Sequence, residues 1–163
     1  MKKPWNRINL PVYSLSSKSN AKQNMHIITY ATAVSMQPKQ YVVAVYKGTK
    51  TLELINESPH FVLQLLGEDQ YNLVKLLGQK SGNKIDKIQR LQKRKLLAEW
   101  NGFAVLSEAI AWMEMKARAL VVNKDFNQPD HQLFLCDVVA HKNVREGEAL
   151  TVDILRQKGI VRM

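Results

Sequence analysis

Hydroxyl and lysine side chains gather in two short segments of this sequence, and these residue types are suited to binding a small anion. The first segment holds Thr29, Tyr30, Thr32 and Ser35, and the second is the run 47–51, Lys-Gly-Thr-Lys-Thr. A lysine and two threonines where a helix begins could hold a phosphate, because the first N–H groups of a helix have no partner within it. A capped turn without a ligand uses the same residue types, so both interpretations stay open.

No standard catalytic or nucleotide-binding motif accompanies these residues. The sequence contains no G-x-S-x-G, no G-x-G-x-x-G and no G-x-x-x-x-G-K-[ST]. Its four histidines are scattered and its single cysteine is Cys136, so we expect no metal site and no intrachain disulfide. Cys136 lies in the apolar run 133–138, which favours a small buried side chain over a reactive thiol.

Positive charge is concentrated in residues 84–95, Lys-Ile-Asp-Lys-Ile-Gln-Arg-Leu-Gln-Lys-Arg-Lys, within a chain whose formal net charge is +10. Ile85, Ile88 and Leu91 recur at helical spacing, which predicts an amphipathic helix with a basic face. That face could be solvated, could assist an anionic cofactor or could meet nucleic acid. No aromatic residue interleaves with the charges, which argues against a stacking surface for single strands.

Length and composition predict an ordinary globular protein. The chain has 163 residues, of which 45% are hydrophobic and 23% charged. No apolar run approaches the roughly 20 residues that a membrane-spanning helix needs. The opening Met-Lys-Lys-Pro-Trp has no apolar stretch behind it, so we expect no export, no membrane association and a cytoplasmic location.

The elements that would position these residues are mostly strands. Residues 1–20, with two prolines and several serines, predict an irregular N-terminal arm, and residues 21–163 predict one domain. Residues 109–122 favour a helix by composition but alternate with period two, which predicts a strand. The remaining predictions are strands over 27–35, 41–46, 61–66 and 132–139, a helix over 52–57 capped by Thr51, helices over 68–79 and 84–95, and a short final element over 150–155. This order predicts a mainly β fold with inserted helices, built as a closed or nearly closed antiparallel barrel.

Several of these segments, in this order, resemble the flavin reductase-like family. The similarity is carried by residues 24–35, 41–55, 57–65, 81–88 (Ser-Gly-Asn-Lys-Ile-Asp-Lys-Ile) and 130–138 (Asp-His-Gln-Leu-Phe-Leu-Cys-Asp-Val). The resemblance extends from about residue 10 to about residue 160. The chain departs from the family pattern at Lys84, Pro129 and Cys136.

The resemblance implies an FMN-binding split barrel of the antiparallel Greek-key type, acting as a homodimer with flavin at or near the subunit interface. It also implies the following site residues: Thr29, Tyr30, Ala31 and Thr32 along the isoalloxazine; Lys47, Thr49 and Thr51 along the ribityl chain and phosphate; Ser81, Lys84 and Lys87 on the phosphate side; and His131 near the flavin or nicotinamide. In a hydride transfer from nicotinamide to flavin, His131 would orient the nicotinamide or supply a proton. The alternative is that His131 has a structural role only.

The function implied by the resemblance is hydride transfer from NADH or NADPH to flavin, with FMN as the cofactor. Its partners would be flavin and nicotinamide nucleotides and a flavin-accepting oxygenase or other redox partner. Two alternatives stay open: an FMN-binding electron-transfer or flavin-carrier protein without NAD(P)H turnover, and a basic nucleic-acid-binding barrel.

Overall fold

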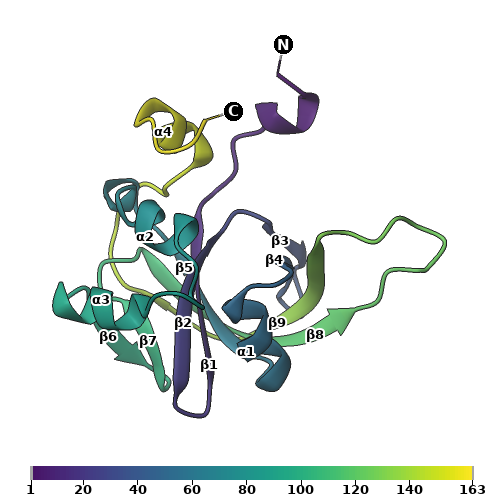
Figure 1. Cartoon of the computed structure of the whole chain (residues 1–163), viewed down its shortest axis with the longest axis horizontal. Coiled ribbons are helices and arrows are strands. Elements are labelled where there is room, and N and C mark those ends of the chain that lie inside the picture. Colours follow the sequence, from purple (N-terminus) through teal and green to yellow (C-terminus); the bar gives the residue numbers. More distant parts are fainter. Residues whose placement is uncertain (1, 163) are drawn as a thin grey trace.

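A computed structural model of the chain, described here over residues 2–162, contains a seven-stranded antiparallel sheet in the order β2-β1-β5-β8-β9-β4-β3 (Figure 1). The strands are β1 (Tyr13–Ser19), β2 (Lys22–Ile28), β3 (Ala31–Ser35), β4 (Gln40–Tyr46), β5 (His60–Leu65), β6 (Leu97–Trp100), β7 (Phe103–Leu106), β8 (Ala111–Leu120) and β9 (His131–Asn143). The helices are η1 (Pro4–Arg7), α1 (Lys50–Glu57), η2 (Glu68–Gln70), α2 (Leu73–Gln79), α3 (Lys87–Lys93) and α4 (Val152–Gln157). The prediction of a mainly β, antiparallel fold with inserted helices is confirmed.

The sheet curls until its two edges almost meet. Strands β2 and β3 are its opposite edges, yet only Thr29 and Tyr30 separate them along the chain. Three peptide steps join Ile28 to Ala31 and span at most about 10 Å, so the end of β2 lies close to the start of β3. The predicted strand over 27–35 was therefore wrong in one respect, because it is two strands that break at Thr29 and Tyr30.

The N-terminal arm is also corrected, since Tyr13–Ser19 is strand β1 and lies between β2 and β5 inside the sheet. Four of its seven residues are serines, which suggested a loop. All four are buried, and one of them, Ser16, donates from its hydroxyl to the carbonyl of Ala104 at 2.6 Å. Such a partner lowers the cost of burying a hydroxyl.

The other predicted elements are found with shifted ends. Thr49, and not Thr51, caps α1, where its Oγ1 accepts from the N–H of Leu52 at 3.3 Å. The predicted helix over 68–79 is divided into η2 and α2, and the basic helix is α3, shorter than expected and capped by Asp86. The final element is helix α4, and the β6–β7 hairpin was not predicted.

Buried apolar side chains form two cores on either side of β1 and β2. Figure 1 shows α2, α3 and the β6–β7 hairpin to the left of these strands, and α1 with β3, β4 and β9 to the right. Strand β8 serves both cores because successive side chains of a strand point to opposite faces of the sheet. As a result Trp112 joins the first core, and Met115 joins the second. Cys136 is fully buried in the second core, as expected, and burial raises the pKa of its thiol to about 12.

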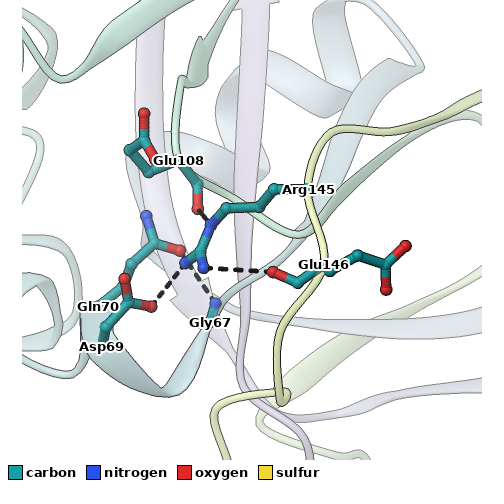
Figure 2. A network of polar contacts seen from close by, with 6 residues as sticks. All are labelled: Gly67, Asp69, Gln70, Glu108, Arg145 and Glu146. Carbon is teal, nitrogen blue, oxygen red and sulfur yellow. Dashed lines mark hydrogen bonds and ion pairs between the residues drawn. The ribbon is translucent and has the colours of Figure 1, made fainter.

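Arg145 anchors the segment that follows β9 to Asp69 and Glu108 (Figure 2). Its Nε donates to the carbonyl of Glu108 at 2.6 Å, and its Nη2 lies 2.5 Å from Asp69 Oδ1. Farther along, the Leu150 N–H donates to Leu66 and the Leu150 carbonyl accepts from Val12, each at 2.8 Å. Within residues 2–162, no helix has the length and apolar character needed to cross a membrane.

Candidate functional site

A cavity of about 260 Å³ lies where β2, the start of α1 and the turn after α2 meet. Four residues from the predicted site line it: Thr49, Thr51, Ser81 and Lys87. Its other lining residues are Asn24, His26, Tyr46, Gly48, Lys50, Gly78, Gln79, Lys80 and Gly82. Segments far apart in the sequence therefore converge on one polar cavity.

Lys87 is the most unusual residue of this cavity, because its side chain is only 2% exposed. Its Nζ donates to the carbonyl of Leu77 at 2.7 Å, and none of the ion pairs found within residues 2–162 gives it a carboxylate partner. Burial lowers the pKa of Lys87 to about 8. A buried ammonium without a counter-ion is costly, and an anion in the cavity would offset that cost.

Two further buried polar groups, Asn24 and Thr51, support the floor of the cavity. Asn24 Nδ2 donates to Thr51 Oγ1 at 2.9 Å, and both residues are buried. Thr49 is otherwise engaged, since its hydroxyl donates to the carbonyl of Tyr46 at 2.8 Å while it caps α1. Thr49 therefore contributes to the cavity mainly by fixing the position of the first turn of α1.

His26 was missed by the sequence analysis. Its Nδ1 is buried without a hydrogen-bond partner among the described residues. Burial, with smaller effects from Lys87 and His131, lowers the pKa of its imidazole to about 4. His26 is thus neutral at physiological pH and has one ring nitrogen available to a ligand. Its only sequence signal was its place in a segment of the family resemblance.

A second hollow, of about 190 Å³, continues from the first, since His26 and Tyr46 line both. Three rings form its wall: the centroid of His131 lies 5.2 Å from that of Tyr30 and 5.2 Å from that of Tyr46. His131 Nδ1 lies 2.6 Å from Asp130 Oδ1. Because a carboxylate only accepts, Nδ1 carries the proton and Nε2 is left to face other groups. The two hollows together form one groove, polar at one end and aromatic at the other.

Not all of the predicted site residues reach this groove. Thr29, Tyr30 and His131 line its aromatic end, but Ala31 and Thr32 line neither part. Lys47 lines a separate hollow beside the β8–β9 loop, where its Nζ donates to the carbonyl of Pro129 at 2.6 Å. Lys84 lines a further hollow next to the polar end.

Gly82 sits where the chain passes tightly against Asn24. A Cβ added there would overlap the Asn24 side chain. Because Asn24 is buried and bonded to Thr51, we expect Gly82→Ala to lower the free energy of unfolding by about 1–3 kcal/mol. Chemical denaturation measures this, with Gly78→Ala as the control: there the new Cβ meets Ile27 at 3.4 Å, an ordinary contact. Equal stability of both variants would contradict the close approach.

Comparison with known proteins identifies the family. The model of the flavin reductase like domain matches residues 5–157. The chain belongs to this family. A search of curated protein sequences gave no match.

Several solved structures share the fold of this flavin reductase-like chain. They include an FMN-binding domain of a flavin reductases-like enzyme from Shewanella baltica OS155, 25% identical, with a TM-score of 0.67 over 82% of this chain and 69% of that one. The styrene monooxygenase flavin reductase from Pseudomonas putida S12 is 20% identical, with a TM-score of 0.68 over 88% and 86%. A flavoredoxin from Methanosarcina acetivorans is 19% identical, with a TM-score of 0.69 over 83% and 69%. The FMN-binding split-barrel type is thus the fold of this flavin reductase-like chain.

Proposed function

We propose that this flavin reductase-like protein binds FMN in the groove and transfers a hydride from NADH or NADPH to it. The observation that carries the proposal is the buried Lys87 ammonium, which faces a cavity without a carboxylate partner and adjoins an aromatic hollow. FMN has the matching chemistry, with a phosphate at one end and a flat ring system at the other.

The polar end of the groove fits the phosphate. Lys87 supplies positive charge, Ser81 a hydroxyl and the first turn of α1 its N–H groups. The orphaned Nδ1 of His26 can meet a polar atom of the ligand between the two hollows. The hydrogen bond from Asn24 to Thr51 fixes the relative position of β2 and α1 at this end of the groove.

The aromatic end fits the ring system. The bound flavin would supply the hydride acceptor, while the nicotinamide becomes NAD⁺ or NADP⁺ and a proton from solvent or protein completes the reduction. Tyr30, Tyr46 and His131 would hold the two rings together and exclude water. Asp130 is a positioning residue, because its carboxylate orients the His131 ring at 2.6 Å.

The affinity for FMN should depend on the charge of Lys87. The pKa of Lys87 is about 8, so its ammonium is present below this pH and is lost above it. The FMN phosphate becomes a dianion above about pH 6. We therefore expect the tightest binding between about pH 6 and 8 and a decrease above that range. Flavin fluorescence titrations from pH 6 to 10 measure this, and an affinity that stays constant to the upper end would contradict it.

We also propose that the protein acts as a homodimer. Four apolar side chains on β3, the β3–β4 turn and the β8–β9 loop are strongly exposed: Val34 at 50%, Met36 at 90%, Val121 at 95% and Phe126 at 69%. A second copy would cover such a surface near the aromatic end of the groove. Light scattering should give twice the chain mass and a lower mass for Met36→Asp. A wild-type monomer would contradict the proposal.

Oxidation of NADH and NADPH in the presence of FMN tests the reductase function. We expect steady oxidation that continues when an acceptor reoxidises the flavin, which in the cell would be an oxygenase or another redox partner. FMN-loaded protein that oxidises neither nucleotide would contradict the reductase function and would indicate an electron-transfer or flavin-carrier protein.

A further inference from the structure

Most of the positive charge of the chain lies in residues 80–95, which run from just after α2, through α3, to just before β6. This segment contains seven Lys or Arg residues and one acidic residue, so it carries +6 of the net charge of +10. Six of the basic side chains are exposed, and we name them the basic ridge: Lys80, Lys84, Arg90, Lys93, Arg94 and Lys95. Figure 1 shows α3, the helix within the ridge, at the outer left of the molecule.

The basic ridge has no counter-charge within the chain. None of the ion pairs or cation–π contacts found within residues 2–162 includes a ridge side chain. The one acidic residue of the segment, Asp86, is occupied as the cap of α3, where its Oδ1 accepts from the N–H of Gln89 at 2.9 Å. Like charges gathered on one surface repel each other, and an anionic partner would offset that repulsion.

Helix α3 turns its charges outward because its other side is fixed in the core. Leu91 is fully buried in the first core, and Ile88 packs against that core. Arg90, Lys93 and Arg94 are three and four residues apart, so they are neighbours on the outer side of the helix. Seven helical residues span about 10 Å, and a nucleic-acid duplex carries one charge per about 1.7 Å of its axis. The ridge can therefore meet several phosphates of a duplex at once.

The side chains that the ridge lacks decide which polyanion fits it. The apolar residues of 80–95 are Ile85, Ile88 and Leu91, and all three pack into the first core, so none is left as an exposed anchor. Protein interfaces have an apolar or aromatic centre, single strands stack on aromatic rings, and stable attachment to a membrane surface buries apolar side chains. The backbone of a duplex is held by basic side chains alone.

We propose that the basic ridge binds the phosphate backbone of double-stranded nucleic acid without reading its sequence. This inference does not rest on the proposed flavin function. Four ridge residues, Arg90, Lys93, Arg94 and Lys95, line none of the hollows described above, so the bound duplex and FMN occupy different places.

Fluorescence anisotropy with a labelled DNA duplex of about 20 base pairs tests the proposal on the full chain. The affinity should fall as salt rises, with a log–log slope set by the number of phosphates neutralised, at about 0.9 for each. Arg90→Gln/Lys93→Gln/Arg94→Gln should reduce that slope by about 3 and weaken binding at least about tenfold at low salt. Glutamine keeps the helix propensity of α3, and thermal unfolding confirms that the variant is folded.

The matched control, Lys2→Gln/Arg7→Gln/Lys39→Gln, removes the same charge from exposed positions outside the ridge. Its slope should equal that of the wild type, and excess FMN should leave duplex binding unchanged. DNA and RNA duplexes of the same sequence identify the source of the backbone, which is the duplex bound more tightly at equal salt.

Four results would overturn the proposal. The first is a wild-type protein that binds neither duplex at low salt, and the second is an equal slope for the ridge variant and the control. The third is displacement of the duplex by FMN, which would place the phosphates in the groove. The fourth is tighter binding of a single strand or of a polyglutamate peptide than of the duplex, since the latter would indicate an acidic protein as the partner. The proposed flavin function would stand in each case.

Discussion

Lys87→Met should weaken FMN binding by about a hundredfold, because it removes a buried charge that we place against the phosphate. Hydrogen bonds to charged groups contribute up to about 3 kcal/mol, and 1.4 kcal/mol corresponds to a factor of ten. Lys87 is only 2% exposed, and methionine keeps most of its side-chain volume at this buried position. Fluorescence titration with FMN gives the affinity of each variant.

Two controls separate the loss of charge from damage to the fold. Lys93→Met makes the same substitution on α3 at an exposed position, and its FMN affinity should equal that of the wild type. Lys87→Met also leaves the carbonyl of Leu77 without its donor, so thermal unfolding must show that the variant is folded at the titration temperature. A folded Lys87→Met protein with wild-type affinity would show that the phosphate lies elsewhere.

His131→Ala should slow hydride transfer by about a hundredfold while the FMN affinity changes by less than about threefold. His131 contacts the rings of Tyr30 and Tyr46 and is held by Asp130. Because this cluster of rings would keep the flavin and the nicotinamide in place, its loss would disturb their alignment. The groove would still hold the phosphate, which lies at the other end. Single-turnover reduction of bound FMN by NADH, followed at the flavin absorbance, measures the transfer step directly.

His141→Ala provides the matched control, because His141 is exposed on the same strand, β9, and does not line the groove. Its transfer rate should equal that of the wild type. If His131→Ala reduced FMN as fast as this control, His131 would be a structural residue.

The strands that sequence patterns predict best here are those with apolar β-branched or alternating residues. Strands β4 and β5 and the alternating β8 were predicted close to their observed positions. Strand β1 was not, because no local pattern reveals that its serines are buried, or that Ser16 finds a distant partner in the Ala104 carbonyl. The break at Thr29 and Tyr30 was missed for a related reason: it results from the closure of the whole sheet, and both flanking segments favour strands.

The site residues, like the strands, could be predicted only where the sequence carries a local signal. The family resemblance selected Thr51, Ser81 and Lys87, which lie on three separate segments, and the structure brings them to one cavity. It also selected Lys47, but the Nζ of Lys47 donates to the carbonyl of Pro129 and the residue does not line the groove. His26 gave no local signal, because a histidine on an apolar strand is usually a packed core residue. Only the fold shows that its Nδ1 lacks a partner beside Lys87.

The central claim is that the groove recognises flavin through its phosphate, and a comparison of FMN with riboflavin tests it most directly. The two ligands share the ring system and ribityl chain and differ only in the phosphate. Titration of the wild-type protein at pH 7 should give an affinity for FMN about a hundredfold higher than for riboflavin. In Lys87→Met that difference should largely disappear. Equal affinity of the wild-type protein for FMN and riboflavin would contradict the account.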